Sequence, residues 1–163
     1  VLGSLLVGAH FAPILGLPYA FASYFAPELL EQALQIYRAK CQPSAQCQTS
    51  YAMAGVNVVL AETDEQAQHL FTSIQQRFAD MFRGSRGLLK PPIADIETYW
   101  TESEKAQASR MLSCSFVGSP ETVQALLKSF VQRTGVDELM VASAIYDHEA
   151  RLKSYELLAA LEI

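Results

Sequence analysis

The stretch Gly16-Leu17-Pro18-Tyr19-Ala20-Phe21-Ala22 places a short apolar run directly after a glycine and a proline. A run of this length between turn residues is typical of a parallel β-strand that is buried on both faces. Before it, residues 5–15 predict a short helix, with Gly16 just past the helix end. After it, Pro27 suits the first position of another helix. The stretch therefore predicts a buried strand with a helix on either side.

The alternation of strand and helix continues along the chain. Residues 54–61 are rich in valine and form the best predicted strand of the sequence. Thr63 and Gln66, three residues apart, predict a capping box at the start of a long amphipathic helix. The apolar side chains that define this helix are Ala67, Leu70, Phe71, Ile74, Phe78, Met81 and Phe82.

Residues 84–112 differ in composition from the chain around them. They contain Gly87, the pair Pro91-Pro92 and a mostly polar run around Trp100. A structureless loop of this length is unusual in a compact domain, so we expect an insertion with short helical pieces.

Two further strand–helix units follow the insertion. Residues 115–117 predict a short strand, Ser119 an N-cap and Pro120 the first residue of a helix that ends at Gly135. Residues 139–142 predict the last strand and residues 147–161 the last helix. The side chains expected to face inward on the helix after Pro120 are Val123, Leu126, Leu127, Phe130 and Val131.

This order predicts an α/β fold of right-handed parallel βα units. Alternation alone does not separate a doubly wound sheet from a barrel. The chain holds four or five strong βα units, which is about half of the eight that a barrel requires.

Composition excludes several classes of protein. At 163 residues the chain fits one domain, and only 18% of its residues are charged. A nucleic-acid-binding protein needs clustered Lys and Arg. Here the net charge is −5, and the widest basic patch, formed by Arg83, Arg86 and Lys90, reads as a solvated loop. We therefore expect no nucleic-acid partner.

The apolar and cysteine patterns argue against a membrane protein and a disulfide framework. The longest apolar stretch, residues 5–25, is interrupted by Pro13, Gly16 and Pro18, so it fails as a membrane span. The three cysteines form no CxxC pair and no zinc spacing, and the sequence contains no signal-peptide pattern. We expect a reduced, cytoplasmic protein without a metal site and without membrane contact.

Several stretches, in this order and at these intervals, resemble the luciferase-like flavin monooxygenases. They cover essentially the whole chain. The matching stretches are Val1-Leu2-Gly3-Ser4, Gly16-Leu17-Pro18-Tyr19-Ala20-Phe21-Ala22, Val117-Gly118-Ser119-Pro120-Glu121-Thr122-Val123, Asp137-Glu138-Leu139-Met140-Val141, Tyr146-Asp147-His148 and Arg151-Leu152-Lys153-Ser154-Tyr155-Glu156.

The resemblance implies the C-terminal half of a (β/α)8 barrel, with about four βα units plus the insertion at 84–112. It implies reduced FMN as cofactor (a deazaflavin in some branches), O2 and a small organic substrate. A flavin reductase and a homodimer are the partners it suggests. Relative to full-length members, the first four βα units are absent, with some of the loops that contact flavin and substrate.

In similar proteins the turn after the fifth strand binds the FMN phosphate. Here that turn runs from Gly3 to Ala9, and the resemblance implies Gly3, Ser4, Gly8 and Ala9 as cofactor-binding residues. Free backbone N–H groups at a helix start favour an anion, and glycine permits close approach. The family has further hydroxyl residues where Leu5 and Gly8 stand, so a turn that only packs is an equal alternative.

Other polar residues have a structural and a functional interpretation. Gly118-Ser119 could bind a phosphate, but an N-cap explains Ser119 fully. His148 follows the last strand, where barrel active sites gather, and is a weak catalytic candidate beside a capping role for Asp147. We expect a hydrogen-bonded or packing role for His10 and a buried hydrogen-bond network for Asn57.

Three readings of function remain open. The first is an enzyme fragment, because Val1-Leu2-Gly3 reads as the end of a buried strand, and we expect it to be weak or inactive alone. The second is a half-barrel without catalysis that acts in dimerisation or partner binding, because a half-barrel exposes edge strands and apolar helix faces. The third is a complete small doubly wound domain whose likeness to the barrel is incidental.

Overall fold

The computed structural model describes residues 1–85 and 87–163, so Arg86 of the predicted basic patch lies outside the described residues. The chain divides into two compact units, each treated by itself below. The first comprises Val1–Val56, Met111–Cys114 and Ser129–Val141, and the second comprises Asn57–Arg110, Ser115–Lys128 and Ala142–Ile163. That the whole chain forms one partial barrel domain with an insertion at 84–112 stays a prediction.

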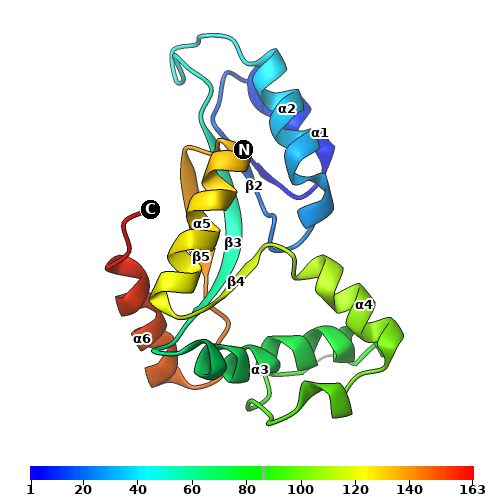
Figure 1. Cartoon of the computed structure of the whole chain (residues 1–163). Helices are drawn as coiled ribbons and strands as arrows, with labels where there is room; N and C mark the ends of the chain where they lie inside the picture. The colour runs from blue at the N-terminus through cyan, green and yellow to red at the C-terminus, as the bar shows by residue number, and fades with distance from the viewer. Residues whose placement is uncertain (86) are drawn as a thin grey trace. The chain divides into compact units, whose positions relative to one another are not determined.

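The fold is mixed α/β with a parallel sheet, as the alternation predicts (Figure 1). The strands are β1 (Leu2–Gly3), β2 (Tyr19–Phe21), β3 (Ala52–Leu60), β4 (Ser115–Gly118) and β5 (Glu138–Ala142). Their order is β1-β2-β3-β4, and β5 also pairs with β3. The pairs β1–β2, β2–β3 and β3–β4 are parallel, with Tyr19 opposite Ala52 and Asn57 opposite Ser115.

Helices separate successive strands, and the predicted insertion contains two helical pieces. The helices are α1 (Leu6–Ile14), α2 (Leu30–Lys40), α3 (Asp64–Phe82), α4 (Glu102–Met111), α5 (Pro120–Thr134) and α6 (His148–Ala159), with 3-10 turns at Pro27–Leu29 and Ile96–Thr98. None of the helices within residues 1–85 and 87–163 combines the length and apolar character that crossing a membrane requires.

The core of the first unit lies between its strands and the helices α1 and α2. Tyr19 of β2 and Tyr37 of α2 are completely buried, with ring centroids 5.3 Å apart. Gly16 ends α1 in the left-handed region at φ 64°, and the N–H of Leu17 then donates to the carbonyl of Ala12. This hydrogen bond confirms the predicted glycine stop, which turns the chain directly into β2.

Polar contacts fix the start of β3 in the first unit. The N–H of Ala52 donates to the Asp137 carboxylate at 2.8 Å, and the N–H of Asp137 donates back to the carbonyl of Ala52 at 2.8 Å. Nearby, the Arg38 guanidinium donates to the carbonyl of Thr134 at 2.8 Å and to that of Gly135. Arg38 thereby satisfies carbonyls that the end of α5 leaves without helical partners.

The second unit is organised by α3. Thr63 accepts a hydrogen bond from the N–H of Gln66, which confirms the predicted cap. The helix also buries polar side chains that hold the chain after residue 90. Gln76 donates to the carbonyl of Pro91 at 2.9 Å, and the Thr72 hydroxyl accepts from the N–H of Ile93 at 2.9 Å.

The prediction that Leu126 faces inward is wrong. Leu126 of α5 is exposed, because the buried stripe of that helix follows Val123, Leu127 and Phe130 at spacings of four and three residues. Met81 is also exposed, near the C-terminal end of α3.

The predicted basic patch consists of paired charges where it is described. Arg83 binds Glu104 at 2.7 Å, and Lys90 binds Asp80 at 2.7 Å. These ion pairs partly neutralise Arg83 and Lys90 within the second unit, and both side chains stay partly exposed.

Arg38→Met tests how much the hydrogen bonds from Arg38 to the carbonyls of Thr134 and Gly135 stabilise the first unit. The substitution keeps much of the apolar stem but removes two charge-assisted hydrogen bonds. We expect the free energy of unfolding, measured by urea titration, to fall by about 1–3 kcal/mol. Arg133→Met is the matched control, because its exposed ion pair with Glu31 at 3.3 Å should contribute less than about 1 kcal/mol. Equal losses in both variants would contradict the assignment.

Candidate functional site

The turn between β1 and α1 offers free backbone donors. Helix α1 follows Leu5, whose side chain cannot cap it, so the first N–H groups of the helix have no side-chain acceptor. The hydroxyl of Ser4 precedes this helix start and has no hydrogen-bond partner among the described residues. Unpaired N–H groups at a helix start, next to a free hydroxyl, are suited to bind an anion.

The same turn is tightly packed on its inner side. A Cβ added to Gly8 would lie 3.1 Å from the Tyr19 ring, so that position accepts glycine most readily. Ala9 is fully buried, whereas Gly3 and Ser4 are half-buried. Tyr19 is buried, its hydroxyl has no partner among the described residues, and burial raises its pKa to about 12.

These features fit a phosphate group in part. Ser4 and the helix start can donate hydrogen bonds, and Gly3 and Gly8 lie close together, since a Cβ on either would lie 3.7 Å from the Cα of the other. The turn contains no cationic side chain, and Leu5 and Val7 are exposed beside it. Packing explains Gly8 and Ala9, whereas packing does not explain the free donors at Ser4 and the start of α1.

The second helix start that follows a Gly-Ser pair, Gly118-Ser119 before α5, already binds the carboxylate of Asp64. One Asp64 carboxylate oxygen accepts from the N–H of Ser119 at 2.7 Å, and the other accepts from the Thr122 hydroxyl at 3.1 Å. The Ser119 hydroxyl accepts from the N–H of Thr122, as expected of an N-cap. The capping interpretation of Ser119 is therefore confirmed, and the N–H of Ser119 already donates to Asp64.

Gly118 and the negative charge of Asp64 both contribute to the contact between Asp64 and the start of α5. A Cβ on Gly118 would lie 2.7 Å from the Asp64 carboxylate oxygen and 2.8 Å from a Thr122 methyl group. Hydrogen bonds from the N–H of Ser119 and the Thr122 side chain hold the pKa of Asp64 below its usual range. The sequence analysis missed Asp64, which lies 55 residues before Ser119.

His148 lies in the first turn of α6 on the surface of the second unit. Asp147 accepts a hydrogen bond from the N–H of Ala150, so its predicted capping role is confirmed. The Nδ1 atom of His148 lies 3.0 Å from the Arg151 guanidinium. The cofactor turn at Gly3–Ala9 belongs to the first unit, so a catalytic role for His148 stays a prediction.

The other polar predictions have structural outcomes. His10 is exposed, and its Nδ1 atom lies 2.8 Å from the Lys40 ammonium, so it is hydrogen-bonded. Asn57 is buried and donates to the Ser115 hydroxyl at 3.3 Å, which confirms the predicted network.

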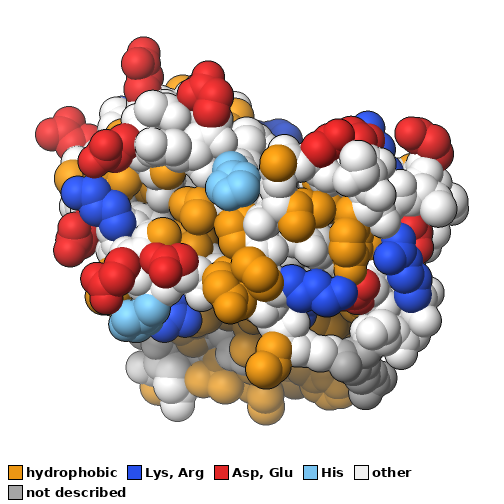
Figure 2. Space-filling view, turned by 90° about the horizontal axis from the view of Figure 1, so that it is seen from below, with side chains coloured by type: hydrophobic (Ala, Val, Ile, Leu, Met, Phe, Trp, Pro, Cys, Tyr) orange, Lys and Arg blue, Asp and Glu red, His pale blue; other side chains and the backbone are white. Residues whose placement is uncertain are grey.

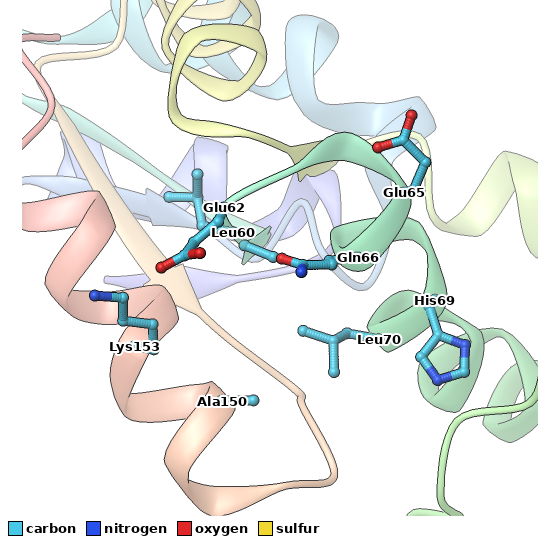
Figure 3. Close-up of a pocket in the computed structure, with 9 residues that line it drawn as sticks. Leu60, Glu62, Glu65, Gln66, His69, Leu70, Ala150 and Lys153 are labelled. Atoms are coloured by element: carbon cyan, nitrogen blue, oxygen red, sulfur yellow. The ribbon is translucent and has the colours of Figure 1, made fainter.

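A pocket of about 500 Å³ lies at the carboxyl end of β3 within the second unit. Leu70 of α3 and Ala150 of α6 face each other across it, and Glu62 and Lys153 lie along one side (Figure 3). Its floor is mainly apolar, and charged side chains lie around it. Figure 2 shows a face on which hydrophobic side chains gather among charged ones.

The sequence analysis did not predict this pocket. The one local signal is the run Leu60-Ala61-Glu62, where a buried strand ends in an acidic residue. Ligands of parallel α/β proteins commonly bind beyond the carboxyl ends of strands, which makes the pocket a second candidate site.

Comparison with known proteins identifies relatives over nearly the whole chain. The sequence is 45% identical over 157 residues to a luciferase-like monooxygenase of Escherichia coli K12, a match that covers 96% of this chain and 47% of that protein. This chain is a relative of the luciferase-like monooxygenases. No protein-family model matches it. The Bacillus subtilis protein YvbT is 45% identical over 98% of this chain and 47% of its own length.

Solved structures give the same fold. Apo-MsnO8 is 31% identical with a TM-score of 0.78, over 97% of this chain and 48% of that one. The oxygenating constituent of 3,6-diketocamphane monooxygenase, solved with FMN, superposes with a TM-score of 0.58 at 17% identity, over 93% of this chain and 43% of that one. The resemblance to luciferase-like monooxygenases is confirmed, and the chain spans about half the length of the curated relatives it matches.

Asp64→Asn tests how much the negative charge of the Asp64 carboxylate stabilises the start of α5. Because the folded-state pKa of Asp64 is lowered, its ionised carboxylate stabilises the fold above the ordinary Asp pKa of about 3.9. That contribution is lost as the pH falls through the lowered folded-state value. We expect the variant to be less stable at pH 7 and the deficit to shrink in acid, measured by urea titration across pH.

Glu65→Gln is the matched control for Asp64→Asn. Glu65 is also an acid in the first turn of α3, but it makes no hydrogen bond to the described residues. A deficit of Asp64→Asn that stays constant from pH 7 into acid would contradict the role of its charge.

Proposed function

We propose that this chain is part of a flavin-dependent oxidoreductase or monooxygenase that oxidises a small organic substrate. The observation that carries the proposal is the 45% identity to the Escherichia coli luciferase-like monooxygenase over 96% of this chain. The proposed cofactor is reduced FMN, and a deazaflavin is the less favoured alternative. A similar solved structure contains FMN, and another is a coenzyme F420-dependent reductase.

The proposed cofactor contact is the turn from Gly3 to Ala9. Ser4 and the N–H groups at the start of α1 would donate hydrogen bonds to the phosphate. The roles of Gly3, Gly8 and Ala9 in cofactor binding rest on the family resemblance, and Ala9 is fully buried. When bound, reduced flavin would supply two electrons to O2, so that one oxygen atom enters the substrate and the other leaves as water. The task of this chain is to bind and orient the cofactor, and His148 stays a weak candidate for a catalytic residue.

The proposal includes a half-barrel architecture and the partners that follow from it. We place the chain as the C-terminal half of a (β/α)8 barrel, because it spans about half of each curated relative. We propose weak or absent activity for this length of chain alone, a cytoplasmic location, homodimerisation and a flavin reductase as electron donor. The alternative function is a half-barrel without catalysis that acts in dimerisation or partner binding, which the exposed apolar side chains of α1 favour.

A flavin titration tests the proposed phosphate contact. We expect the isolated chain to bind FMN weakly and riboflavin more weakly still, because riboflavin lacks the phosphate. Ser4→Ala should weaken FMN binding about tenfold through loss of a hydrogen bond to a charged group. The measurement is the change in flavin fluorescence on titration with protein.

Ser119→Ala is the matched control for Ser4→Ala, because the Ser119 hydroxyl already donates to the Thr122 hydroxyl and the Ser119 N–H donates to Asp64. It should leave FMN affinity unchanged. Equal affinity for FMN and riboflavin would exclude the phosphate contact, and tight FMN binding by the isolated chain would contradict the expected weakness of the half-barrel.

A further inference from the structure

The pocket at the carboxyl end of β3 is built entirely from residues of the second unit. Leu60 and Ala61, which line it, are buried. Leu70 of α3 and Ala150 of α6 are half-buried and face each other across it (Figure 3). Its volume of about 500 Å³ is in the range of sites that bind small molecules. The pocket therefore has an apolar interior with room for a small organic ligand.

The way in which α6 is attached explains why this space is open. Ser154 is the buried residue of α6, and its hydroxyl accepts a hydrogen bond from the N–H of Leu60 at 3.0 Å. Ala150 lies one helical turn before Ser154 on the same face of the helix and has only a methyl group as its side chain. A polar contact thus holds α6 in place, and no large apolar side chain of α6 fills the space beside Leu70. Protein interiors are otherwise close-packed, so a space of this size is unusual.

The acidic side chains that line the pocket are Glu62 and Glu65. Both are exposed, and neither carboxylate has a hydrogen bond or an ion pair within the part of the chain that the structure describes. Asp64 of the same turn differs from them, because its carboxylate accepts hydrogen bonds from Ser119 and Thr122. The carboxylates of Glu62 and Glu65 are therefore available to a ligand.

The other polar lining residues leave this negative charge in excess. Gln66 and His69 each have an atom that can accept a hydrogen bond. Lys153 is the cationic side chain of the described lining, and its ammonium lies 3.9 Å from the carboxylate of Glu156, which does not line the pocket. The pocket thus combines two unpaired carboxylates with one ammonium that already has an acidic neighbour.

We propose that this pocket binds a small apolar organic cation, such as a protonated amine with a hydrocarbon body. The hydrocarbon part lies against Leu60, Leu70 and Ala150. The ammonium group lies at the rim, where Glu62 and Glu65 accept its hydrogen bonds. This ligand is additional to the proposed flavin, and its site depends neither on the turn from Gly3 to Ala9 nor on the half-barrel architecture.

Charge complementarity distinguishes this ligand from others of the same size. A carboxylate on an apolar body would have Lys153 as its partner but would be repelled by Glu62 and Glu65. A neutral molecule would gain from the apolar interior alone. A cation gains from both the interior and the rim, although exposure of the carboxylates keeps the second contribution modest.

Three probes with the same ring test the sign of the charge: cyclohexylmethylammonium, cyclohexylmethanol and cyclohexanecarboxylate. We expect the 163-residue chain to bind the ammonium about three- to fivefold more tightly than the alcohol, as exposed ion pairs allow, and the carboxylate most weakly. Calorimetry gives the three affinities. Amide shifts in NMR spectra should locate each probe at Leu70 and Ala150.

The paired substitution Glu62→Gln with Glu65→Gln tests the two carboxylates. It should abolish the preference for the ammonium, a loss of about three- to fivefold in its affinity, and leave the affinity for the alcohol unchanged. The matched control is Glu149→Gln with Glu162→Gln, which removes the same charge from exposed residues of the second unit that do not line the pocket. The control should leave all three affinities unchanged.

Two further variants test the cation and the space. Lys153→Met keeps the apolar stem, so it should strengthen binding of the ammonium and weaken binding of the carboxylate. Ala150→Phe places a ring where the ligand lies, so all three probes should bind at least about tenfold more weakly. Urea titration of each variant verifies that the chain is still folded, and the glutamine pair tests the proposal even where Ala150→Phe unfolds it.

Several results would overturn the proposal. They are no binding of the ammonium, equal or tighter binding of the carboxylate, an unchanged preference in the Glu62 and Glu65 variant, and amide shifts confined to residues outside the pocket. A chain that binds FMN but not the ammonium probe would sink this inference alone. A chain that binds the ammonium probe but not FMN would sink the proposed cofactor alone.

Discussion

The buried strand β3 is the constraint on which both compact units depend. Its residues from Ala54 to Leu60 are all buried, and its first part belongs to the first unit and its last part to the second. A strand buried in this way must satisfy all its backbone donors and acceptors inside the protein. At the start of β3 the Asp137 carboxylate accepts a hydrogen bond from the N–H of Ala52. At its end the Ser154 hydroxyl accepts one from the N–H of Leu60.

The hydrogen bond between Leu60 and Ser154 explains how α6, a weakly amphipathic helix, is held in place. Few side chains of α6 are buried, and Leu152 and Tyr155 are partly exposed. Ser154 instead lies 3.3 Å from the Ser143 hydroxyl, and the Tyr155 hydroxyl accepts from the N–H of Ser143. Hydrogen bonds to the end of β3 and to the chain after β5 therefore position this helix more than an apolar stripe does.

The sequence predicts those features of the fold that depend on neighbouring residues. The glycine after α1, the Thr63 cap, the Asp147 cap and the strand in β3 each follow from residues within a few positions of one another, and each is present. Contacts across long separations were missed, as Asp64 at the start of α5 shows. A serine after a glycine predicts a cap, but nothing near it predicts that a distant carboxylate will accept from the N–H of Ser119 and the hydroxyl of Thr122.

The same contrast limits what the sequence reveals of the candidate sites. The two glycine–serine helix starts look alike as sequence, and only the structure distinguishes an occupied one at Ser119 from an open one at Ser4. The pocket beyond Leu60 was missed because its lining comes from α3 and α6, which are about 80 residues apart in the chain. Sites assembled from distant segments carry little local signal.

Helix α1 shows how a sequence can predict an element correctly and still leave its surroundings open. Its apolar residues and its glycine stop fix its bounds, yet its composition gives no polar side to face water. Such a sequence is consistent with its fold only if both sides of the helix are covered. Ser4 lies just before this helix, and the exposed stripe from Val7 to Ile14 lies on it. The free hydroxyl and the apolar stripe therefore lie next to each other in the first unit.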